Sequence, residues 1–148
     1  MGDAQAEVRW VAAATELEGA LALREEVFCG EQGVPRELEF DGRDADALHV
    51  VALAPGRNDV VGTLRLLLEG EQAKIGRVAV ARDWRGRGIA SRMLEIALTH
   101  ARATGARRAR LAAQIDARAL YARAGFLVES EPFQEAGIAH VWMGLALK

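Results

Sequence analysis

Glycine and arginine alternate in one short segment, which reads Arg85-Gly86-Arg87-Gly88-Ile89-Ala90. It follows a predicted strand and precedes a predicted helix. The glycines allow a tight turn that directs successive backbone N–H groups inward, beside the first amides of the helix, which have no partners within that helix. The helix dipole and the arginines, including Arg92, add positive potential. We therefore predict an anion site with pyrophosphate as its natural ligand, against the alternative of an ordinary glycine-rich turn.

The charges around this segment divide the chain into two regions of opposite sign. Residues 74–92 contain six basic side chains and only Asp83 as an acid, whereas residues 25–46 contain eight acids against Arg36 and Arg43. The basic region suits an anionic ligand. The acidic region would attract a cationic amine, unless it is a solvated surface. The formal net charge of −2 and the 5% of aromatic residues are not typical of a nucleic-acid-binding protein.

Hydrophobic periodicity predicts the elements that must hold these residues in place. Strands are expected at residues 8–14, 49–54, 60–69, 73–80, 109–114, 126–130 and 138–147, and helices at 15–29, 89–105 and 115–125. Thr15 and Glu18 have the spacing of a capping box for the first helix, and Gly30 marks its expected end. Three hairpin-like strands followed by helical crossovers favour a mixed α/β sheet over a doubly wound parallel one.

Length and composition set the class of protein. The 148 residues, 51% of them hydrophobic, can bury a core without disulfides, and the single cysteine, Cys29, is interpreted as a small buried residue. No run approaches the ~20 apolar residues of a membrane span, and the first residues lack the pattern of a secretory signal. The three histidines have no paired spacing, so no metal site is expected. We expect one domain over residues 1–148, located in the cytoplasm.

The residue order of the glycine-rich segment excludes two nucleotide-binding motifs, because it contains neither a Walker loop nor the third glycine of a Rossmann fingerprint. The segment instead resembles the Arg/Gln-x-x-Gly-x-Gly/Ala motif of the GNAT superfamily of acyl-CoA-dependent N-acetyltransferases. Arg85, Gly88 and Ala90 occupy the named positions of that motif. A second signature of the superfamily is matched by Ala117, Leu120-Tyr121 and Gly125-Phe126.

Two longer stretches, EQGVPRELEFDGRDADALH and QEAGIAHVWM, resemble the ElaA-like branch of the superfamily, although Ala139 stands where that branch usually has proline. The resemblance implies the GNAT fold, a central mixed and splayed β-sheet flanked by helices. It also implies that the backbone of Val78, Ala79 and Val80 contacts the pantetheine arm of acetyl-CoA, and that the loop from Arg85 to Ala90, with Ser91, holds the pyrophosphate. Gln114 could pair with a pantetheine amide or be a solvated side chain.

Tyr121 is the catalytic residue that the resemblance implies. A phenol with an ordinary pKa of about 10 can hydrogen-bond to, or protonate, the thiolate that leaves in acyl transfer. The alternative is a core aromatic residue. The amine must be neutral to attack, yet the predicted strand 73–80 has no carboxylate where many relatives place a base. The remaining candidates for the base and for binding the acceptor amine are Glu31, Glu37, Glu39, His49 and His140.

The activity that the resemblance implies is transfer of an acetyl group from acetyl-CoA to a primary amine, by direct attack in a ternary complex. The acceptor would be a small molecule or a peptide. The alternative is a sensor module that binds acyl-CoA or CoA without turnover, which the missing carboxylate favours and Tyr121 argues against. No nucleic acid or membrane partner is expected. GNAT-like folds often pair, so a homodimer is a candidate assembly.

Overall fold

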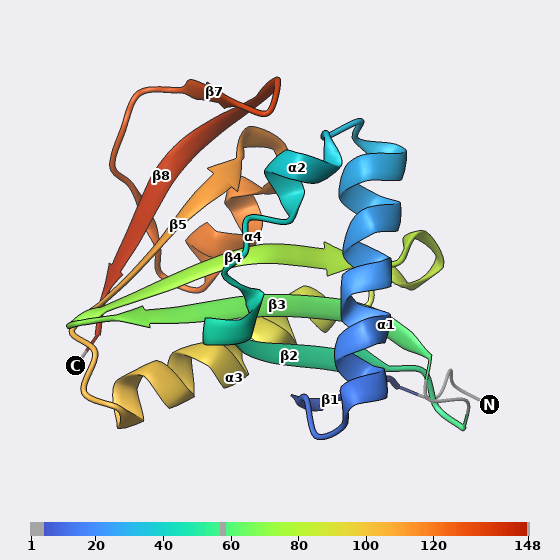
Figure 1. Cartoon of the computed structure of the whole chain (residues 1–148). Coiled ribbons are helices and arrows are strands. Elements are labelled where there is room, and N and C mark those ends of the chain that lie inside the picture. The colour runs from blue at the N-terminus through green and yellow to red at the C-terminus, as the bar shows by residue number, and fades with distance from the viewer. Residues whose placement is uncertain (1–4, 57–58, 148) are drawn as a thin grey trace.

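An eight-stranded sheet runs through the computed structural model, which describes residues 5–56 and 59–147 (Figure 1). Its strand order is β1-β2-β3-β4-β5-β8-β6, and β7 pairs with β8. The strands are β1 (Glu7–Trp10), β2 (Leu48–Leu53), β3 (Val60–Glu69), β4 (Gln72–Val80), β5 (Arg108–Gln114), β6 (Leu127–Val128), β7 (Phe133–Glu135) and β8 (Ile138–Ala146). Because β4 and β5 are parallel and the other pairs antiparallel, the predicted mixed α/β class is confirmed.

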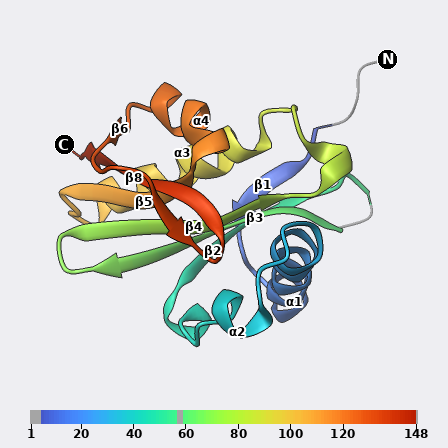
Figure 2. The same cartoon turned by 90° about the horizontal axis from the view of Figure 1, so that it is seen from above.

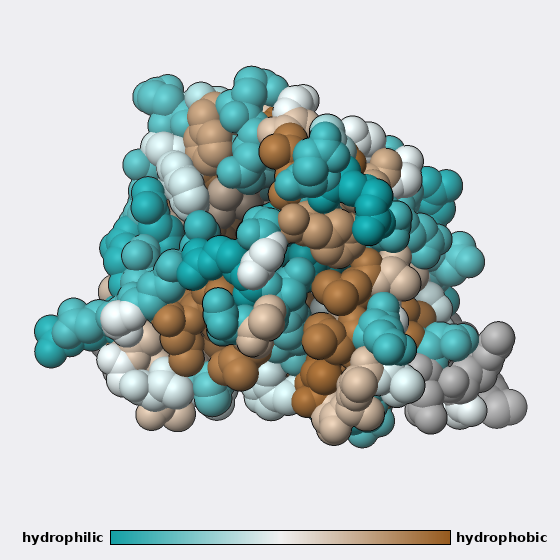
Figure 3. Space-filling view, in the orientation of Figure 1, coloured by the Kyte–Doolittle hydropathy of each residue, from teal (hydrophilic) through white to brown (hydrophobic). Residues whose placement is uncertain are grey.

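Helices cover both faces of the sheet. They are α1 (Ala14–Arg24), α2 (Arg36–Glu39), α3 (Ile89–Ala103) and α4 (Arg118–Arg123), and a π-helix over Glu25–Glu31 continues α1. Helices α1 and α2 lie on one face, and α3 and α4 lie on the other (Figure 2). The face with α1 and α2 mixes hydrophilic and hydrophobic side chains rather than presenting one apolar patch (Figure 3). Among the described residues, no helix is long and apolar enough to span a membrane.

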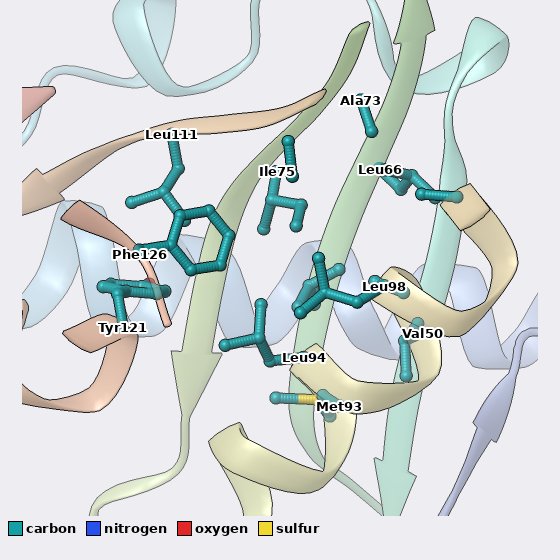
Figure 4. Packing of buried hydrophobic residues seen from close by; sticks show 14 of the residues in the cluster. Val50, Leu66, Ala73, Ile75, Met93, Leu94, Leu98, Leu111, Tyr121 and Phe126 are labelled. Atoms are coloured by element: carbon teal, nitrogen blue, oxygen red, sulfur yellow. The ribbon is translucent and has the colours of Figure 1, made fainter. Parts of the chain in front are cut away.

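The main core lies between α3 and the sheet. The apolar residues of α3 recur at helical spacing, so Met93, Leu94 and Leu98 share one face of the helix and are buried against strands β2, β3 and β4 (Figure 4). Burying each of these side chains fully is worth about 1.5–3 kcal/mol. This packing fixes the N-terminus of α3 beside the end of β4, where the glycine-rich segment lies.

The sheet opens between β4 and β5. These strands pair only where Gln72–Lys74 meets Arg108–Arg110, although β4 has nine residues and β5 has seven. Strand β5 is instead paired along its whole length with β8. Beyond Lys74 the edge of β4 that faces away from β3 therefore has no partner strand among the described residues. The splay that the GNAT resemblance implies is present.

A β-bulge bends β4 at the same place. Thr63 pairs with Ala79 and Arg65 pairs with Gly76, so two residues of β4 face the single residue between them on β3. One of the two is Arg77, whose φ of 53° lies in the left-handed region. That conformation costs about 1–3 kcal/mol in a residue with a side chain. Such strain is typical of functional sites.

The first helix differs from its prediction at both ends. Thr15 lies inside α1 and its side chain caps nothing; Ala13 is the N-cap residue, and the carboxylate of Glu16 accepts a hydrogen bond from the amide of Ala12 at 2.8 Å. The capping-box prediction was therefore wrong. Gly30 does not end the helical segment, because the wider π-helical turns pass through it to Glu31. Strand β3 and helix α3 match their predicted positions closely.

Candidate active site

A cavity of about 480 Å³ occupies the opening between β4 and β5. Its wall is formed by the bulged part of β4, the end of β5, helix α4, the β7–β8 hairpin and the segment that follows α1. The predicted site residues Val78, Gln114, Tyr121 and His140 all line it. Residues from opposite halves of the sequence therefore meet in one space because the sheet is splayed.

Tyr121 reaches this cavity from helix α4. Its ring packs edge to face against Phe126, with 6.1 Å between the ring centroids (Figure 4). Only 7% of the residue is exposed, and burial raises the pKa of the phenol to about 12. No described residue forms a hydrogen bond with the hydroxyl group. The phenol is thus protonated at neutral pH and has a hydrogen to donate toward the cavity.

The glycine-rich loop lies between β4 and α3, as predicted. Gly86 and Gly88 have φ angles of 77° and 80°, and Gly88 is the N-cap residue of α3. Within the described part of the chain, the backbone amides of residues 86–91 have no hydrogen-bond acceptor. They lie at the positive end of a helix of 15 residues. This arrangement suits an anion with several oxygens.

The arginine side chains of the loop are engaged elsewhere. Arg85 donates from Nε to the carbonyl of Val80 at 2.9 Å and from its terminal nitrogen to Glu31 at 2.9 Å. Arg87 lies over the ring of Trp84, 4.5 Å from its centroid. These contacts hold the loop against β4 and the π-helix. The backbone amides of residues 86–91 are donors without a partner among the described residues, whereas each guanidinium already makes one or more contacts.

Gln114 is positioned across the opening by a partner that the sequence did not indicate. Its Nε2 donates to Oε1 of Gln32 at 2.8 Å. Gln32 follows the π-helix and also lines the cavity. The two amides bridge the two halves of the opening, and each of them can exchange its partner for an amide of a bound ligand.

Much of the acidic region is bound by arginines in what we call the ion-pair cluster. Its members are Arg24, Arg65, Arg77, Glu39, Asp41 and Asp44. Arg24 donates to Glu39 at 2.7 Å and to Asp44 at 2.6 Å. Arg65 donates to Asp41 at 2.9 Å and to Asp44 at 3.2 Å, which connects the two arginines through Asp44. Arg77 adds an ion pair with Glu39 at 3.1 Å. The cluster has three positive and three negative groups, so it is neutral when all are ionised.

The pKa values within this cluster move in opposite directions. Hydrogen bonds from the Arg65 guanidinium hold the pKa of Asp41 well below its ordinary value. Burial raises the pKa of Glu39, and the nearby arginines only partly offset it. Since Glu39 also accepts bonds from Arg24 and Arg77, both of its oxygens are occupied. Its geometry is that of a structural ion pair.

The other candidate bases lie in very different places. Glu31 is bound to Arg85 and Arg82, which lower its pKa. Glu37 is exposed and does not line the cavity. His49 is buried on β2 outside the cavity; its Nε2 donates to the carbonyl of Asp44 at 2.9 Å, and its Nδ1 is buried without a partner among the described residues.

Two of the candidate bases line the cavity, Glu39 and His140, and of these His140 is not part of the ion-pair cluster. Its Nδ1 lies 2.7 Å from the carbonyl of Ile138, and because a carbonyl only accepts, Nδ1 carries the hydrogen. In the neutral ring, Nε2 then has the free lone pair. That atom lies 3.8 Å from the carboxylate of Glu135, which also lines the cavity. The ring stacks on Phe133 at 5.9 Å, which holds its orientation.

The structure combines a splayed sheet, a bulged β4 and a loop at the start of α3 whose amides have no acceptor among the described residues. A model of the acetyltransferase (GNAT) domain matches residues 11–147. The chain belongs to the GNAT acetyltransferase family. This GNAT chain is 40% identical over 129 residues to UPF0039 protein Rv2851c of Mycobacterium tuberculosis, covering 83% of this chain and 80% of that protein. It is 33% identical over 129 residues to the uncharacterized N-acetyltransferase YjcF of Bacillus subtilis, covering 86% of this chain and 91% of that protein.

Solved structures agree with this assignment. The GNAT chain is similar to Escherichia coli ElaA, with a TM-score of 0.82 and 25% identity, covering 94% of this chain and 98% of that one. It is equally similar to an acyl-CoA N-acyltransferase from Pseudomonas aeruginosa, with a TM-score of 0.82, 32% identity and the same coverage of 94% and 98%. The resemblance to the superfamily and its ElaA-like branch is confirmed. The protein is an acyltransferase whose family implies an acyl-CoA donor and an acceptor.

Several cavity residues were not predicted from the sequence. Lys74 lines the cavity and lies in no stretch that resembles the family. Gln32, Glu135 and Trp142 also line it; they lie in the two stretches that resemble the ElaA-like branch but were not singled out as site residues. The alternation of Ala73, Lys74 and Ile75 along a strand is a signal for Lys74, because it places this cation on the face opposite to the core. For the other three residues, the signal is their place in the stretches that resemble the ElaA-like branch.

Proposed function

We propose that this GNAT protein transfers an acetyl group from acetyl-CoA to the primary amine of a small molecule or peptide, by direct attack in a ternary complex. The observation that carries the proposal is that one cavity is bordered by the unpaired edge of β4, the phenol of Tyr121 and the imidazole of His140. Donor, leaving group and acceptor can therefore meet there without a covalent enzyme intermediate.

The coenzyme would lie along the opening of the sheet. The amides of residues 86–91 would bind its pyrophosphate, and the backbone of Val78, Ala79 and Val80 would pair with its pantetheine arm as a missing strand would. Gln114 would exchange its bond with Gln32 for a pantetheine amide. The backbone N–H groups near the bulge would polarise the thioester carbonyl, because fixed donors stabilise the oxyanion that develops there.

His140 is the base in this proposal. The amine nitrogen forms a bond to the carbonyl carbon, the carbon–sulfur bond breaks, and the sulfur leaves with the electron pair. Nε2 of His140 accepts the proton that the amine loses and passes it to solvent. Its geometry supports this role, because Nδ1 is already bound to the carbonyl of Ile138 and Nε2 has the free lone pair.

Tyr121 acts on the departing sulfur. With a pKa of about 12, its phenol is a much weaker acid than a thiol, whose ordinary pKa is about 8.5. Full proton transfer to the thiolate is therefore unfavourable by about three pKa units, roughly 4–5 kcal/mol. A hydrogen bond from the phenol to the thiolate has no such cost, and it stabilises the charge as it forms. This argument selects hydrogen bonding over protonation.

Release of the coenzyme thiol on addition of primary amines is the measurement that tests the proposal. Amine-dependent release from acetyl-CoA supports an acetyltransferase. Thermal stabilisation by the coenzyme with no release for any amine would instead support the sensor module. At about 100-fold excess over its dissociation constant, a ligand of the folded state stabilises by roughly 2.7 kcal/mol, so binding is detectable without turnover.

A further inference from the structure

The strained residue of β4 is an arginine, although a glycine lies beside it. Arg77 has a φ of 53°, whereas Gly76 does not adopt a positive φ, even though glycine takes such angles without strain. Ala136 is the other described residue with both a side chain and a positive φ. It lies in the two-residue turn between β7 and β8, and such turns impose positive φ angles. Arg77 lies within a strand, so no turn imposes its conformation.

The guanidinium group of Arg77 is bound at the end of helix α2. It donates to the backbone carbonyl of Glu39 from Nε at 3.2 Å and from a terminal nitrogen at 3.1 Å, and to the carbonyl of Leu38 at 3.3 Å. The last carbonyls of a helix have no partner within it, so they are open to such donors. Arg77 also forms ion pairs with the carboxylates of Glu39, at 3.1 Å, and Asp41, at 3.4 Å. The side chain therefore ties the bulge of β4 to the C-terminal end of α2.

The acceptors of Arg77 are themselves held in place. The second carboxylate oxygen of Glu39 lies 2.7 Å from the guanidinium of Arg24, and these two side chains are only 4% and 1% exposed. Arg24 is the last residue of α1, which packs on the sheet through the fully buried Ala20. Hydrogen bonds between charged groups are stronger than neutral ones. The end of α2 is therefore a fixed point to which Arg77 is attached.

We infer that Arg77 is a positioning residue: its side chain, held by Glu39, keeps the backbone of β4 in the strained bulge that borders the cavity. This inference rests on the proposed function, in which the backbone of this strand binds the coenzyme. Gly76, Arg77 and Val78 all line the cavity. A change of residue 77 to a negative φ would turn the peptide groups on either side of it. The backbone groups that the pantetheine arm and the thioester carbonyl need would then be lost.

Two substitutions at this position separate the backbone from the side chain. Arg77→Met removes every contact of the guanidinium but keeps a Cβ, so the bulge loses its anchor and still has strain to relieve. Arg77→Gly removes the same contacts, but glycine adopts a φ of 53° without strain. Calorimetry with CoA on the full-length protein measures the dissociation constant of each variant.

The expected affinities differ between the two variants. Arg77→Met should bind CoA at least about tenfold more weakly than the wild-type protein, which lies within the range that the strain of one such residue represents. Arg77→Gly should bind within about threefold of the wild-type protein, with a small loss because glycine has more conformational freedom to lose. Thiol release from acetyl-CoA should show the same order of rates.

Arg9→Met is the matched control. Arg9 donates to both carboxylate oxygens of Glu16, at 2.8 and 2.6 Å, so it also ties a strand to a helix. It lies on β1, at an edge of the sheet, and does not line the cavity. Loss of this ion pair should lower the melting temperature and leave the affinity for CoA unchanged. A purely structural role for Arg77 would give the same result in Arg77→Met.

The possible results separate the inference from the proposed reaction. Wild-type affinity in Arg77→Met would mean that strand register alone holds the bulge, and an equal loss in both variants would mean that the guanidinium itself contacts the coenzyme. Either result overturns the inference, as does failure of both variants to fold or a wild-type protein that does not bind CoA. If only Arg77→Met fails to fold and Arg77→Gly binds CoA, the inference is supported, because the two variants lack the same ion pairs.

Thiol release then tests the reaction independently of binding. If the expected order of affinities is found and no amine releases thiol, the positioning role of Arg77 holds and the proposed reaction is wrong. If amines release thiol equally well with the wild-type protein and with Arg77→Met, acetyl transfer is supported and the inference is wrong.

Discussion

The guanidinium of Arg24 and the carboxylate of Glu39 lie 2.7 Å apart, and their side chains are only 1% and 4% exposed. Glu39 also forms an ion pair at 3.1 Å with Arg77, which lies in the bulge of β4. The same pair therefore joins helix α1, helix α2 and the strained residue of β4. The ion-pair cluster is a structural connection between the acidic region and the strand that borders the cavity.

Replacing Arg24 should destabilise the protein strongly. Arg24→Met would remove the shortest ion pair of both Glu39 and Asp44. Loss of one partner from a buried ion pair typically costs about 3–5 kcal/mol of stability. Urea unfolding followed by circular dichroism measures the change. Arg43→Met is the control, because its pair with Glu69 is exposed and such pairs contribute little. Equal losses in the two variants would contradict the structural role of the cluster.

Tyr121→Phe should slow turnover without weakening the fold. The hydroxyl group has no partner among the described residues, so its removal breaks no internal hydrogen bond. Loss of the hydrogen bond to the leaving sulfur should lower kcat by about 100-fold, the lower end for removal of one donor to a developing anion. Thiol release gives kcat, and calorimetry with CoA should give an unchanged dissociation constant. An unchanged kcat would mean that Tyr121 is a core aromatic residue without a catalytic role.

The ionisation of Tyr121 can be followed directly, because it is the only tyrosine in the chain. The near-ultraviolet absorbance of phenolate should show a midpoint near pH 12 in the folded protein and near pH 10 in denaturant. The folded pKa is the higher one, so stability is fully present below pH 10 and is lost as pH rises toward 12. The loss should reach about 2–3 kcal/mol and be absent in Tyr121→Phe. A folded midpoint near pH 10 would contradict the buried environment.

His140→Gln should lower kcat by about 100-fold, because the amide cannot accept the proton of the amine. Coenzyme affinity should stay within twofold, since His140 lines the acceptor side. His100→Gln is the control: His100 packs against Trp10 in a groove between β1 and α3, away from the cavity. If both variants retain full kcat, then a water chain rather than His140 removes the proton.

Gly88→Ala should weaken coenzyme binding at the pyrophosphate loop. The φ of 80° is unfavourable for alanine by about 1–2 kcal/mol, although its Cβ would meet nothing within 4 Å. Relief of that strain would rotate the amides of the loop away from the anion. Gly105→Ala has a φ of 87° and equally open surroundings, at the far end of α3. If the two variants have similar melting temperatures and only Gly88→Ala has a raised dissociation constant for CoA, the result supports pyrophosphate binding by the loop.

Elements with strong local patterns were predicted well. Strand β3 matches its expected bounds, Val60 to Glu69, because a continuous apolar run ends in charged turn residues. Helix α3 follows from its apolar spacing, and the turn before it follows from its glycines. The capping box at Thr15 failed because the chain enters α1 two residues earlier than that pattern implies. Which residue becomes the N-cap of α1 therefore depends on where the preceding strand ends.

The candidate site could be predicted only in part. Tyr121 and the loop 85–91 follow from matched motifs, whereas Lys74 lies outside every stretch that resembles the family. Glu135 and Trp142 lie in a stretch that resembles the ElaA-like branch, but nothing in that stretch singles them out. The bulge at Arg77 could not be predicted, because its strain depends on the register with β3 and on contacts with Glu39. Strand register depends on how two segments pair, so the sequence of neither segment alone determines it.

The sequence by itself determined the family, the mixed sheet and the two functional motifs, since these depend on residue type and short spacing. The tertiary structure alone decided which charges are free. Glu31 is bound by Arg85, 54 residues away, and Glu39 by Arg24, 15 residues away, whereas Lys74 is left without a partner in the described chain. Ion pairs form through space between side chains that the sheet brings together. A count of charges along the chain therefore identifies an acidic region, but not whether its carboxylates are available to a substrate.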